Sequence, residues 1–134
     1  MSSRLNPYLH FNGNARQALE FYASVFGGNP SMTRFAEMGR QGADADRIMH
    51  GQLETDAGYT IMASDATSDM QPDPVSGFTV SISGDDATAL HGYWEKLSEG
   101  GTVTMPLEKQ AWGDEFGMCT DRFGVPWMVN IGQA

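Results

Sequence analysis

The stretch "TDAGYTIMASD", residues 55–65, returns near the end of the chain as "TDRFGVPWMVN", residues 120–130. Both stretches begin with Thr-Asp, pass through a turn that contains glycine, and end in a short apolar strand. Met62 and Met128 occupy the same step of the two strands. A hairpin that occurs twice in one short chain indicates an internal duplication.

A second pair of matching segments extends this duplication to helices. "GNARQALEFY" begins at Gly13 and "GDDATALHGY" begins at Gly84, with the glycine, the Ala-Leu pair and the tyrosine in register. Apolar residues at helical spacing predict one helix over residues 15–26, with Asn14 as its N-cap, and a second over residues 86–99. Each helix follows a short strand and ends at a Gly-Gly pair. The order of elements therefore predicts two βαβββ modules.

The modules have definable limits within a single domain that spans residues 1–134. Module one covers about residues 5–65 and module two about residues 77–132. The segment between them, about residues 66–76, is rich in proline and small polar residues, which is typical of a linker. We therefore predict the α+β class, with the two modules forming a curled mixed sheet around a groove.

The strands alternate between an apolar face and a mixed face. In "YTIMAS", Ile61 and Ala63 alternate with Thr60, Met62 and Ser64. The apolar face suits packing against an amphipathic helix, so the mixed face is predicted to line the groove. The same parity places further side chains of both modules in the groove: Asn6, Tyr8, His10, His50, Gln52, Glu54, Thr79, Met128 and Asn130.

Composition excludes several classes of protein. The chain has 134 residues and a formal charge of −9, and an acidic chain repels nucleic-acid backbones. The single cysteine, Cys119, excludes a disulfide framework and a four-cysteine zinc site, and no basic neighbour activates it as a nucleophile. The N-terminal stretch has no apolar signal region and no run approaches a membrane span, so we expect a soluble cytoplasmic protein with no membrane or nucleic-acid partner.

Two βαβββ modules of this size resemble the glyoxalase/bleomycin-resistance family, also called the vicinal oxygen chelate superfamily. The segments "YLHFNGNARQALEFYASVFGG" and "QAWGDEFGMCTDRFGVPWMVNI" resemble its PhnB-like branch more narrowly. That branch has a Gln-x-Trp-Gly stretch, then Asp-Pro-Phe-Gly, then Trp, which correspond here to Gln110, Trp112, Gly113, Asp121, Phe123, Gly124 and Trp127. Arg122 replaces the usual proline of this pattern, and Val125 replaces a common histidine.

The resemblance also implies where a metal would be held, because metal-using relatives take one His or Glu from each of four strands. Those positions fall here on Asn6 or Pro7, on Met62, on Thr79 or Phe78, and on Met128. None of these residues is a histidine or a carboxylate, and thioethers suit only soft ions. The resemblance therefore predicts a groove without metal or other cofactor, with an apolar methionine floor, in a homodimer.

The leading functional prediction is that this groove binds a small organic molecule, with sequestration of a toxic compound as one version. Trp112 and Asp114 lie on a glycine-flanked loop suited to a flat or cationic ligand. The complete set of predicted ligand contacts is Tyr8, His10, Met62, Thr79, Trp112, Asp114, Met128 and Asn130. The methionines could equally be core fillers, and Trp112 could be a structural residue of a hairpin turn.

Two further functions remain open. His10, His50 and Glu54 share the mixed face, so they could form a displaced metal site in a metal-dependent lyase or dioxygenase. The other possible function is that of a sensing or interaction module without chemistry of its own. No hydrolase elbow, P-loop or dinucleotide fingerprint is present, and nothing resembles an S-adenosylmethionine site.

Overall fold

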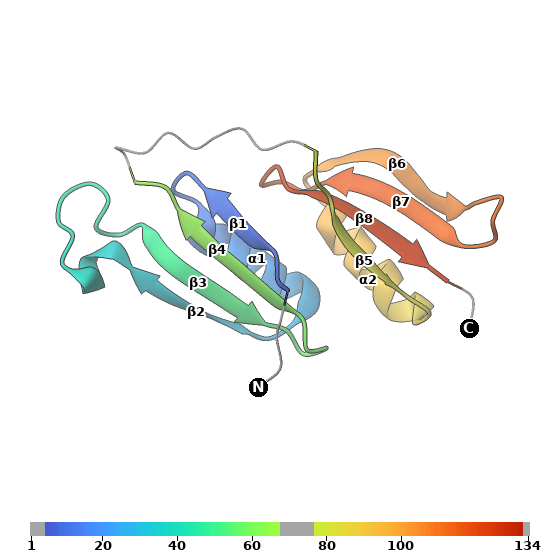
Figure 1. Cartoon of the computed structure of the whole chain (residues 1–134). Helices are drawn as coiled ribbons and strands as arrows, with labels where there is room; N and C mark the ends of the chain where they lie inside the picture. The colour runs from blue at the N-terminus through green and yellow to red at the C-terminus, as the bar shows by residue number, and fades with distance from the viewer. Residues whose placement is uncertain (1–4, 68–76, 133–134) are drawn as a thin grey trace. The chain divides into compact units, whose positions relative to one another are not determined.

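The structure is a computed structural model that describes residues 5–67 and 77–132 (Figure 1). The chain divides into two compact units, Met1–Pro74 and Val75–Ala134, called unit one and unit two below. Unit one consists of β1 (Tyr8–Phe11), α1 (Ala15–Phe26), β2 (Asn29–Arg34), the short 3-10 helix η1 (Phe35–Met38), β3 (Ile48–Glu54) and β4 (Thr60–Asp65).

Unit two repeats this order without the 3-10 helix. It consists of β5 (Val80–Gly84), α2 (Ala87–Ser98), β6 (Thr102–Lys109), β7 (Glu115–Thr120) and β8 (Pro126–Ile131). The predicted helices are confirmed to within one residue at each end. The second sheet begins two residues later than the pattern predicts, because Phe78 precedes β5 and is exposed rather than covered by the helix.

The two units have the same sheet topology. The strand orders are β1-β4-β3-β2 and β5-β8-β7-β6, so each unit contributes one four-stranded mixed sheet. In each sheet the first and last strands of the unit pair in parallel, and the other neighbours pair antiparallel. The α+β class and the duplicated βαβββ module are therefore confirmed, with the eight strands divided between two sheets of four.

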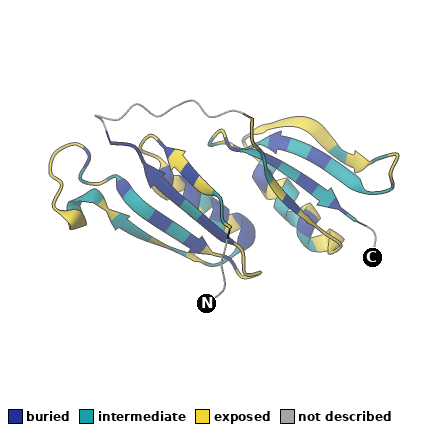
Figure 2. Ribbon diagram, viewed as in Figure 1, coloured by how far each residue is buried: buried dark blue, intermediate teal, exposed yellow. Residues whose placement is uncertain are grey.

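Each sheet carries its helix on one face, and burial follows that arrangement. Figure 2 shows buried and half-buried residues alternating along β8. Gly51 in β3 and Gly117 in β7 allow the close approach, since a Cβ on Gly51 would overlap Leu19 of α1. A Cβ on Gly117 would lie 2.9 Å from the Trp94 ring of α2. In both copies, therefore, a glycine in the sheet allows the helix to pack closely against it.

The N-terminus of α1 is capped by a side chain that is distant in the sequence, and not by the residue at the N-cap position. Asn14 stands at the predicted N-cap position, but its side chain makes no capping hydrogen bond. Instead, the buried Asp65 carboxylate at the end of β4 accepts hydrogen bonds from the backbone N–H groups of Gly13 and Ala15, at 2.9 and 3.0 Å. Its second oxygen accepts from Ile48 N–H at 2.9 Å, so one carboxylate joins α1, β3 and β4.

The first part of the predicted linker belongs to unit one. Ala66 and Thr67 are buried, and Ala66 N–H donates to the Phe11 carbonyl at 2.8 Å. The remainder of the predicted linker, residues 68–76, lies outside the described residues.

Candidate functional site

The face of each sheet opposite its helix, called the open face below, holds the two repeated methionines. Met62 lies between the buried Ile61 and Ala63, and Met128 lies between the buried Trp127 and Val129. Both methionines are half-buried. The structure therefore places them away from the helices, where the alternation predicts them.

The open face of unit one carries a group of polar rings beside Met62, which pairs with Tyr8. The Tyr8 hydroxyl lies 3.3 Å from His50 Nδ1, and the Tyr8 ring is 5.1 Å from the His10 ring between centroids. His10 Nδ1 in turn lies 3.4 Å from the Ser64 hydroxyl. Phenol and imidazole groups can donate and accept hydrogen bonds, so this group can bind a polar ligand.

The carboxylate of the alternative metal site has hydrogen-bond partners other than the two histidines. Glu54 accepts hydrogen bonds from Gln52 Nε2 and from the Thr60 hydroxyl, at 2.7 and 2.9 Å. His10 and His50 make the contacts given above. Across residues 5–67 and 77–132, no three His, Cys, Asp or Glu side chains are placed together so that they could hold a metal ion.

The open face of unit two is richer in sulfur and aromatic groups. Met128 pairs with Met118 of β7, which pairs with Met105 of β6. In the next row, Asn130 pairs with Phe116. These pairings place one aromatic ring and three thioethers on the same side of the sheet, because directly opposed residues share a face.

Trp112 and Asp114 lie at one end of this open face, on the turn that joins β6 and β7. The Trp112 side chain is 63% exposed, and its ring meets the Phe116 ring edge-on at 6.1 Å between centroids. The Asp114 carboxylate accepts a hydrogen bond from Asn130 Nδ2 at 3.1 Å. The predicted tryptophan, carboxylate and amide are therefore close together, with Phe116 added. Thr79, predicted as a polar contact of the same site, is half-buried and immediately precedes β5.

The residues that carry the branch pattern organise the turn before β8. One Asp121 oxygen accepts hydrogen bonds from the backbone N–H groups of Phe123 and Val125, at 2.8 and 3.1 Å. The other accepts from Trp127 Nε1 at 2.9 Å. Gly124 has a φ of 87°, which favours glycine. This part of the pattern is therefore structural.

The two departures from the branch pattern have local explanations. Arg122 donates from Nη2 to the Glu99 carbonyl at 3.0 Å, so it binds the C-terminal end of α2. Val125 is buried, at 7% exposure, and contributes to the core. Neither side chain belongs to the open face.

Cys119 is a structural residue, as the sequence predicts. It is 1% exposed and points to the helix-covered side of β7, opposite the open face. Burial, and secondarily the nearby Asp121 carboxylate, raise its pKa to about 11. A thiol with that pKa is protonated at neutral pH and is a poor nucleophile.

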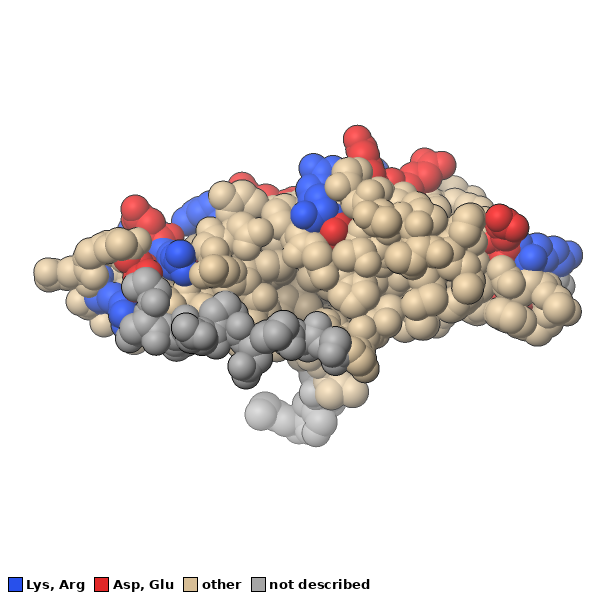
Figure 3. All heavy atoms as spheres, turned by 90° about the horizontal axis from the view of Figure 1, so that it is seen from above, with Lys and Arg blue, Asp and Glu red and all other residues tan. Residues whose placement is uncertain are grey.

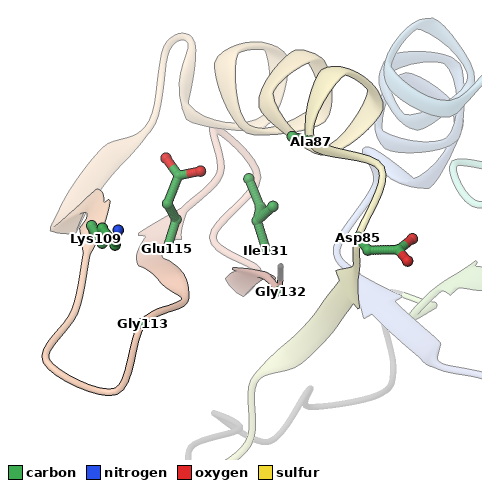
Figure 4. Close-up of a pocket in the computed structure, with 7 residues that line it drawn as sticks. All are labelled: Asp85, Ala87, Lys109, Gly113, Glu115, Ile131 and Gly132. Atoms are coloured by element: carbon green, nitrogen blue, oxygen red, sulfur yellow. The ribbon is translucent and has the colours of Figure 1, made fainter. Parts of the chain in front are cut away.

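A separate depression of about 390 Å³ lies in unit two on the helix-covered side, near the start of α2 (Figure 4). Figure 4 shows the Asp85 carboxylate pointing away from Lys109 and Glu115. Glu115 already contacts His91 at 3.3 Å. None of the predicted ligand contacts lines this depression, whose lining residues are Asp85, Ala87, Lys109, Gly113, Glu115, Ile131 and Gly132.

Surface charge does not single out a site. On the face shown in Figure 3, Lys and Arg side chains lie beside Asp and Glu and form no continuous basic patch. Arg34, for example, pairs with Asp46 at 3.1 Å. Within the described ranges, neither helix is long and apolar enough to cross a bilayer.

Met105, Phe116 and Met118 lie on the open face of unit two but are absent from the predicted set. Phe116 and Met118 share one face of "EFGMCT", so the alternation of that strand could have identified them. Met105 could not be assigned in this way, because the pairing of β6 shifts between Val103 and Met105. A bulge of this kind changes the face of every later residue.

Two βαβββ units with these sheets define the class of the protein, which has the glyoxalase/bleomycin resistance fold. The fosfomycin resistance protein FosX from Mesorhizobium loti shares the fold, with a TM-score of 0.59, 11% identity, and coverage of 99% of this chain and 95% of that one. Residues 3–130 match the model of the family described as 3-demethylubiquinone-9 3-methyltransferase. The chain therefore belongs to that PhnB-like family.

Individual relatives agree with this membership. The protein YjdN of Escherichia coli K12 is 30% identical over 95% of this chain and 94% of its own length. The crystal structure of protein PA1353 from Pseudomonas aeruginosa has a TM-score of 0.88 and 37% identity, covering 99% of this chain and all of that one. The PhnB protein from Bacillus cereus has a TM-score of 0.77 and 21% identity, covering 97% of this chain and all of that one.

Proposed function

We propose that the protein binds a small organic molecule on the open face of unit two, without a metal ion. The observation that supports this most strongly is the grouping of Trp112, Phe116 and the Asp114–Asn130 pair beside Met128. An exposed indole offers a stacking surface, and the carboxylate and amide offer polar contacts at its edge. Methionine adapts its shape to varied apolar groups, which suits a floor for such a ligand.

The charge of this grouping indicates which class of organic ligand would bind. Asp114 supplies a carboxylate, and Glu108 pairs with Phe116 of the adjoining strand, so the two charged groups placed beside the rings are both acidic. An aromatic molecule with a basic amine could stack on the rings and form an ion pair with the carboxylates at the same time. Tyr8, His10 and Met62 on the open face of unit one, and Thr79 before β5, remain predicted ligand contacts.

Thermal-shift screening tests the proposal with a panel of aromatic compounds, half of which carry an amine. A ligand that binds the folded state alone must raise the melting temperature as its concentration rises. Trp112→Ala should weaken a hit by roughly 2- to 30-fold, because lost stacking and cation–π contact cost about 0.5–2 kcal/mol. Trp112→Phe, which keeps a ring, should recover part of the affinity.

Tyr59→Ala provides the matched control, because Tyr59 is an exposed ring on the β3–β4 turn of unit one. The control should bind the hit as the wild type does. The proposal is wrong if no compound stabilises the wild-type protein, or if Trp112→Ala and Tyr59→Ala respond alike. Metal analysis of protein purified without chelators tests the alternative, which requires a stoichiometric metal that is lost in His50→Ala.

We also propose that the protein is a homodimer. In the described residues each sheet has two edge strands, β1 and β2 in unit one and β5 and β6 in unit two. Edge strands favour further pairing or a cover, and β6 exposes the side chains of Val103 and Met105. Light scattering during size-exclusion chromatography should give twice the chain mass, and a monomeric mass at micromolar concentration would contradict the proposal.

A further inference from the structure

Three methionine side chains form a row across the open face of unit two. Met105 pairs with Met118, and Met118 pairs with Met128, on three strands that neighbour one another. Residues directly opposite in a sheet have Cβ atoms about 4.5–5.5 Å apart and share a face. Adjacent thioethers of this row, called the methionine row below, can therefore meet.

The methionine row faces away from the helix and remains accessible. Cys119 and Trp127, which alternate with Met118 and Met128, are buried on the other side of the sheet at 1% and 2% exposure. Met105 is 43% exposed, and Met118 and Met128 are half-buried. None of the three methionines is therefore fully buried in the sheet.

The duplicated unit shows that the fold does not require this sulfur. In unit one the corresponding row consists of Ser31, Gln52 and Met62, in strands that occupy the same places in the sheet. Two positions that hold polar side chains in one copy therefore hold thioethers in the other. The methionine row is a property of the sequence of unit two and not of the βαβββ scaffold.

We propose that the methionine row binds a soft monovalent cation, Cu(I), through its thioether sulfur atoms. Thioethers select Cu(I), whereas hard and borderline divalent ions prefer oxygen and imidazole ligands. Three rotatable bonds allow each methionine to turn its sulfur toward a shared ion. Glu108 shares this face through its pairing with Phe116, so its carboxylate favours a cation there. This activity goes beyond the proposed organic-ligand binding, although both involve Met128.

Anaerobic titration of the full chain with Cu(I), in competition with the chromophoric chelator bicinchoninate, tests the proposal. The wild type should retain one Cu(I) per chain, and X-ray absorption should show sulfur neighbours around the copper. Met118→Leu should weaken retention by at least tenfold, because the central sulfur is the one adjacent to both others. Leucine conserves volume, so the variant should fold as the wild type does.

Two control variants keep the experiment decisive. Met62→Leu removes the equivalent thioether of unit one, and Cys119→Ala removes the buried thiol beside Met118; both should retain Cu(I) as the wild type does. The proposal is overturned if the wild type loses all copper to bicinchoninate, if Met118→Leu retains it, or if either control loses it equally. Because organic hits are measured without copper, failure of either proposal is seen independently of the other.

Discussion

Removal of the Asp121 side chain should strongly destabilise unit two. This side chain is 3% exposed and accepts three hydrogen bonds, from the N–H groups of Phe123, Val125 and the Trp127 indole. A buried donor left without a partner costs about 1–3 kcal/mol. The Val125 and Trp127 bonds are buried, while the Phe123 bond is part-buried and can be replaced by water. Asp121→Ala should therefore lower the free energy of unfolding by about 2–6 kcal/mol.

Asparagine at the same position distinguishes the contributions that the two carboxylate oxygens make to stability. In Asp121→Asn the amide oxygen can keep the bonds from Phe123 and Val125, while the amide nitrogen faces the Trp127 N–H and cannot accept from it. The loss should therefore be about 1–3 kcal/mol, which corresponds to one unpaired donor. Urea unfolding followed by circular dichroism measures both variants, and Asp46→Ala is the control, because Asp46 is 90% exposed and exposed pairs contribute about 1 kcal/mol or less. Equal losses in the two Asp121 variants, or a loss in Asp121→Ala no larger than in the control, would refute this account.

Four other predictions follow from individual residues. Cys119, buried and with a pKa raised to about 11, should resist a disulfide reagent at pH 8 in the native state and react only in denaturant; rapid native labelling would contradict its placement. Gly51→Ala should destabilise the protein by about 1–3 kcal/mol, since its Cβ overlaps a leucine of α1. Gly92→Ala, with no atom within 4 Å of the new Cβ, should stabilise α2 by about 0.5–1 kcal/mol in the same urea assay. Arg122→Ala should cost about 0.5–1.5 kcal/mol through the lost bond to the end of α2, and an unchanged midpoint would argue against that bond.

The fold could be predicted from the sequence because its determinants are local. Periodicity of 3.6 residues marks both helices, and alternation marks the strands, so Leu9 and Phe11 fall under α1 as the parity of their strand requires. The duplication then supplies the topology, because two copies of one module must fold alike. Local patterns do not show which distant group hydrogen-bonds to a helix end. For this reason the sequence predicted Asn14 as the cap of α1, whereas the structure shows Asp65 in that role.

The candidate site was less accessible to prediction, because it depends on register between strands. Trp112 and Asp114 are recognisable as a loop motif, but the contact with Asn130 requires β7 and β8 to pair in one particular alignment. The place of Met105 depends on a shift in pairing that no local pattern reveals. The composition of a strand thus indicates its faces, while the neighbours of a side chain follow from pairing energies summed over the whole sheet.

Comparison of the two units separates residues that shape the backbone from residues available for function. Gly51 and Gly117 occupy the same place under their helices, so both copies of the module lack a side chain at this position. The open faces differ, with phenol, imidazole and amide groups in unit one, and thioethers and aromatic rings in unit two. Positions on the open face are less constrained by helix packing than these glycines, so they can differ between the copies without loss of the fold. The two units therefore have chemically different open faces, and that of unit two is the richer in soft and aromatic groups.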